Sequence, residues 1–268
     1  MKVFVLISIL TLSNHFAGAN DIKAINPPIH YFYNSGWMIE TDKHVVVIDF
    51  ITHAASGTTL RQLENLLRQA DSRGKKIIVL VTHEHQDHFD PLIFQLSNNF
   101  PGIKYILGWK YGAEATIPIQ TLIEGDSLIQ ADYKVYTHAS TDAGVGFLIE
   151  IDGYTIYHAG DHALWTMQML ESFTDQLKQI RSKAKHIDLA FLPAARGMFT
   201  KCTYDSTIRK GLQVSLEILN PHIVALQHIG CEDKLETYKM IHKQLMEKNG
   251  RKKWIVPDHF NQSIKNIL

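Results

Sequence analysis

The chain has 268 residues, of which 45% are hydrophobic and 20% charged, a composition that excludes a disordered or collagen-like protein. Lysine and arginine together number 27, as do aspartate and glutamate, so the chain carries no excess positive charge for a nucleic-acid backbone. A nucleic-acid partner is therefore disfavoured. A chain of this length can bury one large core, and we expect a single folded domain.

The N-terminus has the three parts of a secretory signal peptide. Lys2 supplies a positive charge, residues 3–12 are largely apolar, and residues 17–19 are the small residues that signal peptidase accepts. The apolar run is shorter than the roughly 20 residues that span a bilayer. We predict that residues 1–19 are removed and that residues 20–268 form a periplasmic or secreted domain without a stable membrane anchor. An uncleaved anchor and a buried first strand are the alternatives.

Short β-rich segments recur along the rest of the chain, and several are almost wholly apolar, as in strands buried on both faces of a sheet. The predicted strands cover residues 45–50, 77–82, 104–107, 133–138, 145–151, 154–158, 189–193, 223–228 and 254–256, with an Asp-Gly hairpin turn at 152–153. Helical spacing of apolar residues predicts helices over 60–73, 164–177, 206–219 and 232–250. Mixed strands and helices with buried sheets favour a layered α/β sandwich.

One segment concentrates side chains that bind metals. His83, His85, Asp87 and His88 lie within six residues, directly after the apolar strand, where α/β folds build their sites. In a tight turn, the side chains at 83 and 85 can converge on one ion, while those at 87 and 88 point to a neighbouring position. Imidazole nitrogen and carboxylate oxygen are ligands that Zn²⁺ accepts. The alternative is a polar loop of solvated histidines.

This segment resembles the H-x-H-x-D-H signature of the metallo-β-lactamase superfamily, and later residues match the remaining ligands of that family in order. His138 ends a strand, Asp161 stands in a Gly-Asp turn, and His228 ends a late apolar strand. Taken alone, such histidines are more often structural, and a Gly-Asp pair is only a turn. The resemblance covers nearly the whole mature chain, because residues 35–40 and 47–50 also look like the opening hairpin of the family.

The resemblance implies an αββα sandwich, with two β-sheets face to face and helices outside. It also implies two zinc ions bridged by Asp161. The first ion would be bound by His83, His85 and His138, and the second by Asp87, His88 and His228.

The chemistry that the resemblance implies is hydrolysis by a hydroxide bridging two metal ions roughly 3.5 to 4 Å apart. The expected substrate is a small-molecule ester, lactone or phosphodiester. The resemblance is closest to the branch that includes L-ascorbate 6-phosphate lactonase. Asp87 is a catalytic candidate as well as a ligand, since it can orient the hydroxide and accept its proton. The substrate within these classes and the oligomeric state stay open at this point.

Two further polar residues and the two cysteines have alternative interpretations. His162 follows Asp161 where a small threonine or serine is common, and this second catalytic candidate could bind substrate, protonate the leaving group or point away. Arg196 lies after the strand at 189–193 and is either a phosphate or carboxylate ligand or a solvated loop residue. Export permits a disulfide between Cys202 and Cys231, and two free thiols are the alternative.

Three other functions are weighed against the hydrolase. A β-lactamase in the strict sense is disfavoured because that branch generally lacks the aspartate found here as Asp161. An iron-dependent oxidoreductase is disfavoured because oxygen-reducing di-iron relatives usually have glutamate where this chain has His85. A non-catalytic module is disfavoured because such modules lose ligands, whereas this sequence has a residue for each ligand position.

Overall fold

The computed structural model describes residues 28–112, 117–196 and 203–230, with short C-terminal stretches at 239–240, 243, 253–255, 257 and 259–264. The predicted signal peptide, both cysteines and almost all of the helix predicted over 232–250 lie outside these residues. Within the described part of the chain, no helix is both long and apolar enough to cross a membrane.

The first sheet has seven strands in the order β14-β1-β2-β3-β4-β5-β6. Its pairing changes from antiparallel to parallel at β3, so β3, β4, β5 and β6 all run in one direction. The strands are β1 (Ile29–Tyr31), β2 (Trp37–Glu40), β3 (His44–Ile48), β4 (Lys76–Val81), β5 (Lys104–Leu107), β6 (Ile119–Thr121) and β14 (Gln262–Ile264).

The second sheet also has seven strands, in the order β13-β12-β11-β10-β9-β8-β7, and its pairing becomes parallel at β10. The predicted hairpin between β9 and β10 is confirmed, with positive φ angles of 49° at Asp152 and 81° at Gly153. The strands are β7 (Ser127–Ile129), β8 (Tyr133–Ala139), β9 (Val145–Ile151), β10 (Tyr154–His158), β11 (Leu189–Pro193), β12 (Ile223–Gln227) and β13 (Lys253–Ile255).

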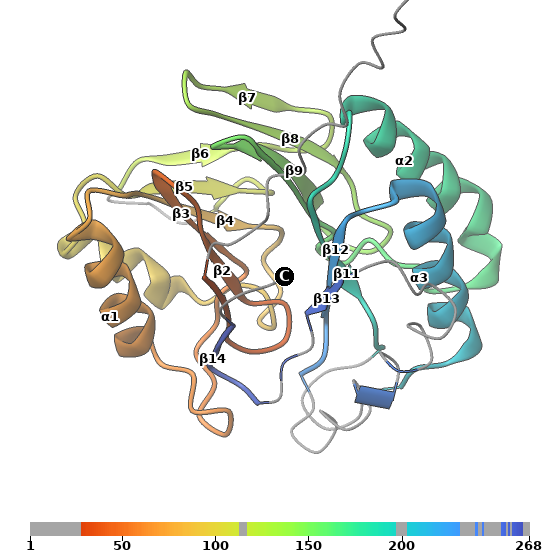
Figure 1. Ribbon diagram of the computed structural model, residues 1–268, viewed down its shortest axis with the longest axis horizontal. Coiled ribbons are helices and arrows are strands. Elements are labelled where there is room, and N and C mark those ends of the chain that lie inside the picture. The colour runs from red at the N-terminus through yellow and green to blue at the C-terminus, as the bar shows by residue number, and fades with distance from the viewer. Residues whose placement is uncertain are drawn as a thin grey trace, which may run out of the picture.

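The sheets pack face to face and helices cover their outer faces, which confirms the αββα sandwich (Figure 1). Trp37 and Phe191 are fully buried between the sheets, with ring centroids 5.0 Å apart. Leu63 of α1 packs on the first sheet, and Phe173 of α2 packs on the second. The helices are α1 (Leu60–Asp71), the 3-10 helices η1 (Pro91–Asn98) and η2 (Met167–Met169), α2 (Leu170–Lys183) and α3 (Ser206–Leu219).

Several element ends differ from the prediction for identifiable reasons. The strand predicted over 223–228 ends at Gln227, because His228 has a left-handed backbone with φ of 60°. The helix predicted from residue 164 begins at Leu170. Leu164 is buried against Gly211 of α3 and belongs to the preceding loop. The unpredicted strands β1, β6, β7 and β14 have three residues each, too few to show a periodic pattern.

The carboxyl ends of strands from both sheets meet in one region of the molecule. The loop after β4 carries the His83 motif, the turn after β10 carries Asp161, and His228 directly follows β12. Two contacts tie the sheets together there: the Val145 backbone N–H donates to the Thr82 carbonyl at 3.1 Å, and Asn34 pairs with Ile229. Side chains distant in the sequence are thereby brought to one place.

Candidate metal centre

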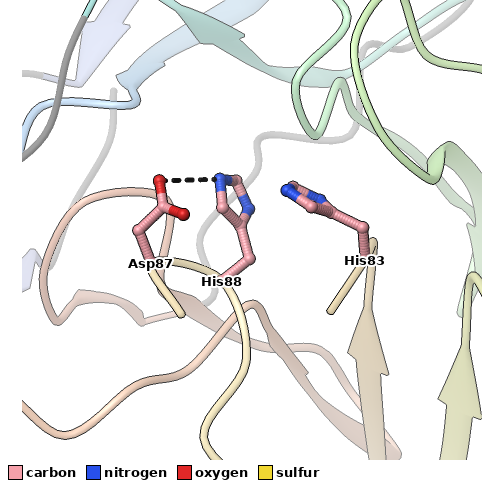
Figure 2. Close-up of side chains that lie close together, drawn as sticks. All are labelled: His83, Asp87 and His88. Carbon is pink, nitrogen blue, oxygen red and sulfur yellow. Dashed lines mark ion pairs between the residues drawn. The ribbon is translucent and has the colours of Figure 1, made fainter. Parts of the chain in front are cut away.

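The loop after β4 directs buried polar side chains toward a common point. His83, Asp87 and His88 are each 1% exposed or less, and Figure 2 shows their side chains facing one another. His88 Nε2 lies 3.5 Å from Asp87 Oδ2, and the His83 and His88 ring centroids are 4.1 Å apart. The loop turns tightly because the His88 N–H donates to the His85 carbonyl at 2.9 Å. These histidines are therefore not a solvated polar loop, although His85 itself is exposed.

Asp161 is the hub of the cluster. Its Oδ1 lies 3.0 Å from His88 Nε2 and 3.5 Å from His228 Nε2, and its Oδ2 lies 3.4 Å from His83 Nε2. Burial raises the pKa of Asp161, but the positive charges of His88 and His228 and the close approach of His83 and His88 hold it well below its usual range. The carboxylate is consequently an anion at neutral pH.

A glycine lets the Asp161 turn pack closely between β9 and the end of β4. Gly160 has φ of 56°, and a Cβ at this position would lie 2.7 Å from the Val145 carbonyl oxygen of β9 and 3.0 Å from Thr82 Cγ2. Only glycine fits this backbone without displacing its neighbours.

Six of the seven predicted ligands come together in three overlapping groups, within each of which the ligand atoms lie within 4.8 Å of one another. The groups are His83, Asp87 and His88; His83, His85 and Asp161; and His88, Asp161 and His228.

Buried polar atoms in these groups have no hydrogen-bond partner among the described residues. They are Nε2 of His83 and His88, and Oδ1 of Asp87 and Asp161. An unsatisfied buried polar atom costs about 1 to 3 kcal/mol, so several at one point indicate a site for a bound species. Imidazole nitrogens and carboxylate oxygens together fit a divalent cation such as zinc.

Each of three histidines has its Nδ1 engaged on the outer side, which leaves Nε2 facing the cluster. His88 Nδ1 donates to Asp49 Oδ2 at 2.8 Å, His228 Nδ1 donates to the Ala195 carbonyl at 3.0 Å, and His83 Nδ1 lies 3.0 Å from the Thr82 hydroxyl. Partners of this kind fix the tautomer and the orientation of metal-binding imidazoles.

Asp49 and Asn34 are positioning residues that no sequence motif predicted. Burial raises the pKa of Asp49, but the charge of His88 and the hydrogen bond with it outweigh this effect and lower the pKa. The Asn34 side-chain amide donates to the Asp87 carbonyl at 3.0 Å and to Asp87 Oδ2 at 3.3 Å. Asn34 has φ of 52°, a left-handed backbone conformation that asparagine tolerates better than most residues.

His138 is the one predicted ligand that the structure does not bring into these three groups. Side chains alternate between the two faces of β8: Val135 packs between the sheets, whereas His138 faces α2. The His138 ring lies against Gly146, where a Cβ would be 2.1 Å from Nε2, and its centroid is 5.4 Å from that of Tyr157. Its Nδ1 donates to the Ala139 carbonyl at 2.8 Å, and burial lowers its pKa to about 4.

His162 also points away from the cluster, which agrees with the third of the three alternatives given for it. Its side chain is buried and stacks on Phe173 of α2, with ring centroids 4.7 Å apart, and it meets His138 edge to face at 5.2 Å. Burial and the neighbouring His138 hold the pKa of His162 well below its usual range. The tight turn places Asp161 toward the first sheet and His162 under the outer helix.

Comparisons with known proteins agree with this fold. The chain matches the model of a beta-lactamase superfamily domain over residues 28–205. It is 29% identical over 185 residues to a metal-dependent hydrolase of Bacillus velezensis, covering 62% of this chain and 72% of the relative.

Two solved structures have the same arrangement. A metallo hydrolase of Ignicoccus hospitalis has a TM-score of 0.57 at 19% identity, covering 90% of this chain and 98% of that one. A diiron β-hydroxylase of Streptomyces venezuelae has the same TM-score at 11% identity, covering 90% of this chain and 54% of that one. At these identities the likeness concerns the fold alone. The family model spans more than half of the chain, which therefore belongs to the metallo-β-lactamase superfamily.

Proposed function

We propose that this protein is an exported hydrolase that binds two zinc ions and cleaves an ester, lactone or phosphodiester of a small molecule. The chain belongs to the metallo-β-lactamase superfamily, and the Bacillus velezensis relative is named a metal-dependent hydrolase. The observation that carries the proposal of two ions is Asp161, which belongs both to the group with His83 and His85 and to the group with His88 and His228. When bound, two divalent ions lower the pKa of water and polarise the carbonyl or phosphoryl group under attack.

Asp87 is the proposed proton acceptor. Asn34 holds one side of its carboxylate through Oδ2, whereas the buried Oδ1 has no hydrogen-bond partner among the described residues. A carboxylate fixed in this way keeps one oxygen for a metal ion or a proton, and a positioned general base contributes about 10² to 10⁴ in rate.

Hydrolysis is tested with a panel of nitrophenyl esters, lactones and phosphodiesters, together with nitrocefin for β-lactamase activity. The protein is stripped with a chelator and then restored with zinc or with iron. We expect one of the first three classes to be cleaved by the zinc form and activity to be lost on stripping. A folded, zinc-loaded protein that cleaves no member of the panel would contradict the proposal.

Export rests on the N-terminal sequence: Lys2, the apolar run at 3–12 and the small residues at 17–19. N-terminal sequencing of protein from the periplasmic and culture fractions is expected to begin at Asn20. Protein that retains Met1 and stays in the cytosolic fraction would overturn this part of the proposal alone.

A further inference from the structure

An aromatic side chain lies beside the last histidine of the metal centre, and a basic side chain packs on that aromatic ring. The Trp165 ring meets the His228 ring at an angle of 62°, with centroids 5.5 Å apart. The Trp165 indole N–H donates to the Asp161 carbonyl at 3.0 Å. The guanidinium group of Arg196 lies over the Trp165 ring, with its Cζ 5.6 Å from the ring centroid. Trp165 and Arg196 are called the Trp-Arg wall below.

Arg196 is fixed in place by its backbone as well as by its side chain. Its backbone N–H and carbonyl pair with Thr203, each hydrogen bond being 2.8 Å long. The preceding residue, Ala195, supplies the carbonyl that accepts from His228 Nδ1. Arg196 is therefore connected to the metal centre twice, through the chain to Ala195 and through the stack on Trp165. It is not the freely solvated loop arginine of the alternative interpretation.

The guanidinium keeps donors for a further partner. Of its five N–H groups, one on Nε donates to Asp205 Oδ2 at 3.1 Å and one on Nη2 donates to the Trp165 carbonyl, and no others have acceptors among the described residues. Asp205 is also engaged elsewhere, since its Oδ1 accepts from the Thr207 and Ile208 backbone N–H groups at the start of α3. The Arg196 side chain is 35% exposed, so solvent and small ligands reach it.

We infer that the Trp-Arg wall binds an oxyanion of the substrate, a carboxylate or a phosphate, while the scissile bond lies at the metal centre. This inference rests on the proposed function and adds to it a substrate class: esters, lactones or phosphodiesters that carry an anionic group on the side of His228. Arginine presents paired donors that match a carboxylate or phosphate, and a fixed guanidinium loses little freedom on binding one. Because the chain has equal numbers of basic and acidic residues, its net charge does not attract anions, and the preference for an anionic substrate would come from Arg196 itself.

The test measures binding, so it does not require turnover. Glutarate and pentanoate have the same length and share one carboxylate, and they differ only in whether the far end is a carboxylate or a methyl group. Zinc-loaded protein and protein as purified are titrated with both by calorimetry. We expect wild type to bind glutarate about tenfold more tightly than pentanoate. Arg196→Gln is expected to reduce that preference to about twofold or less, and Arg196→Lys to leave an intermediate value.

The matched control is Arg68→Gln. Arg68 also stacks on an aromatic ring, with its guanidinium carbon 5.6 Å from the Phe100 centroid, and it also pairs with a carboxylate, that of Glu64. It lies on α1, which covers the other sheet (Figure 1). This variant is expected to keep the full preference for glutarate.

An equal preference for glutarate over pentanoate in wild type and Arg196→Gln, or an equal loss of that preference in Arg68→Gln, would overturn the inference.

Titration with 4-phosphonobutanoate separates the two oxyanions. If this compound binds more tightly than glutarate and the difference is lost in Arg196→Gln, the site is one for phosphate. If the protein cleaves no ester, lactone or phosphodiester but loses its glutarate preference in Arg196→Gln, the proposed reaction fails while the oxyanion site stands. If it cleaves a neutral ester and Arg196→Gln changes no preference, only the inference fails.

Discussion

Replacing Asp49 with asparagine is expected to weaken the metal centre without changing a ligand. The buried carboxylate accepts three hydrogen bonds, from the Thr82 backbone N–H at 2.7 Å, the Thr82 hydroxyl at 2.8 Å and His88 Nδ1 at 2.8 Å. Asparagine keeps one oxygen and places an NH₂ group at the other position, so either Thr82 or His88 faces a donor instead of an acceptor.

The magnitude follows from the charge of the lost acceptor. A hydrogen bond to an ionised group contributes about 1.5 to 3 kcal/mol, and outer partners of metal-binding histidines change metal affinity by roughly 10- to 100-fold. We therefore expect the zinc Kd of Asp49→Asn to rise by about 10- to 100-fold. Competition against a chromogenic chelator measures this Kd, and circular dichroism establishes that the variant is folded.

Asp188→Asn is the matched control. Asp188 is 5% exposed, accepts from the Thr155 backbone N–H at 2.8 Å and lies 3.3 Å from His186 Nε2 and 3.6 Å from His222 Nδ1. Asp188 lies at the amino end of β11, whereas the candidate metal centre lies at the carboxyl ends of β4, β10 and β12. The control is expected to lose stability and keep the wild-type zinc Kd. A wild-type Kd in Asp49→Asn would refute the positioning role of Asp49.

Three further predictions concern stability and ligand identity. Burial lowers the pKa of His30 from 6.5 to about 4, so the unfolded chain takes up a proton first as the pH falls. His30 alone should then remove about 3 kcal/mol of stability between pH 6.5 and 4, and His30→Gln should make the slope shallower by that amount in urea unfolding at a series of pH values; an unchanged slope would contradict the assignment. His138→Ala should keep the wild-type metal content by elemental analysis, and a loss of about one ion per chain would show that His138 is a ligand after all. Gly160→Ala should lower the thermal unfolding midpoint more than Gly74→Ala. Both glycines have positive φ, but only at position 160 would the added methyl group meet a backbone atom, so equal losses of stability would contradict this prediction.

The parts of the site predicted from sequence are those set by local geometry. His83, His85, Asp87 and His88 share one turn after an apolar strand, and a turn of that length keeps its side chains close to one another. The central strands were predictable for a similar reason, because burial on both faces leaves a continuous apolar run.

The missed parts depend on register and on tertiary contacts. Moving one residue along a strand reverses the face of the sheet on which a side chain lies, and sequence alone does not fix which face of β8 carries His138. Val135 packs in the inter-sheet core, and this places His138 on the opposite face. Asp49 and Asn34 contact His88 and Asp87 from other elements of the fold, so no local spacing reveals them.

The most direct test of a two-zinc centre that depends on Asp161 is the metal content of the purified mature protein, compared between wild type and Asp161→Ala. Asp161 lies within ion-pair distance of His83, His88 and His228, and its removal takes an anionic ligand from two groups at once. We predict about two zinc ions per chain in wild type and a clear fall in the folded variant. Iron in place of zinc, or wild-type protein that binds no metal under zinc-replete conditions, would contradict it.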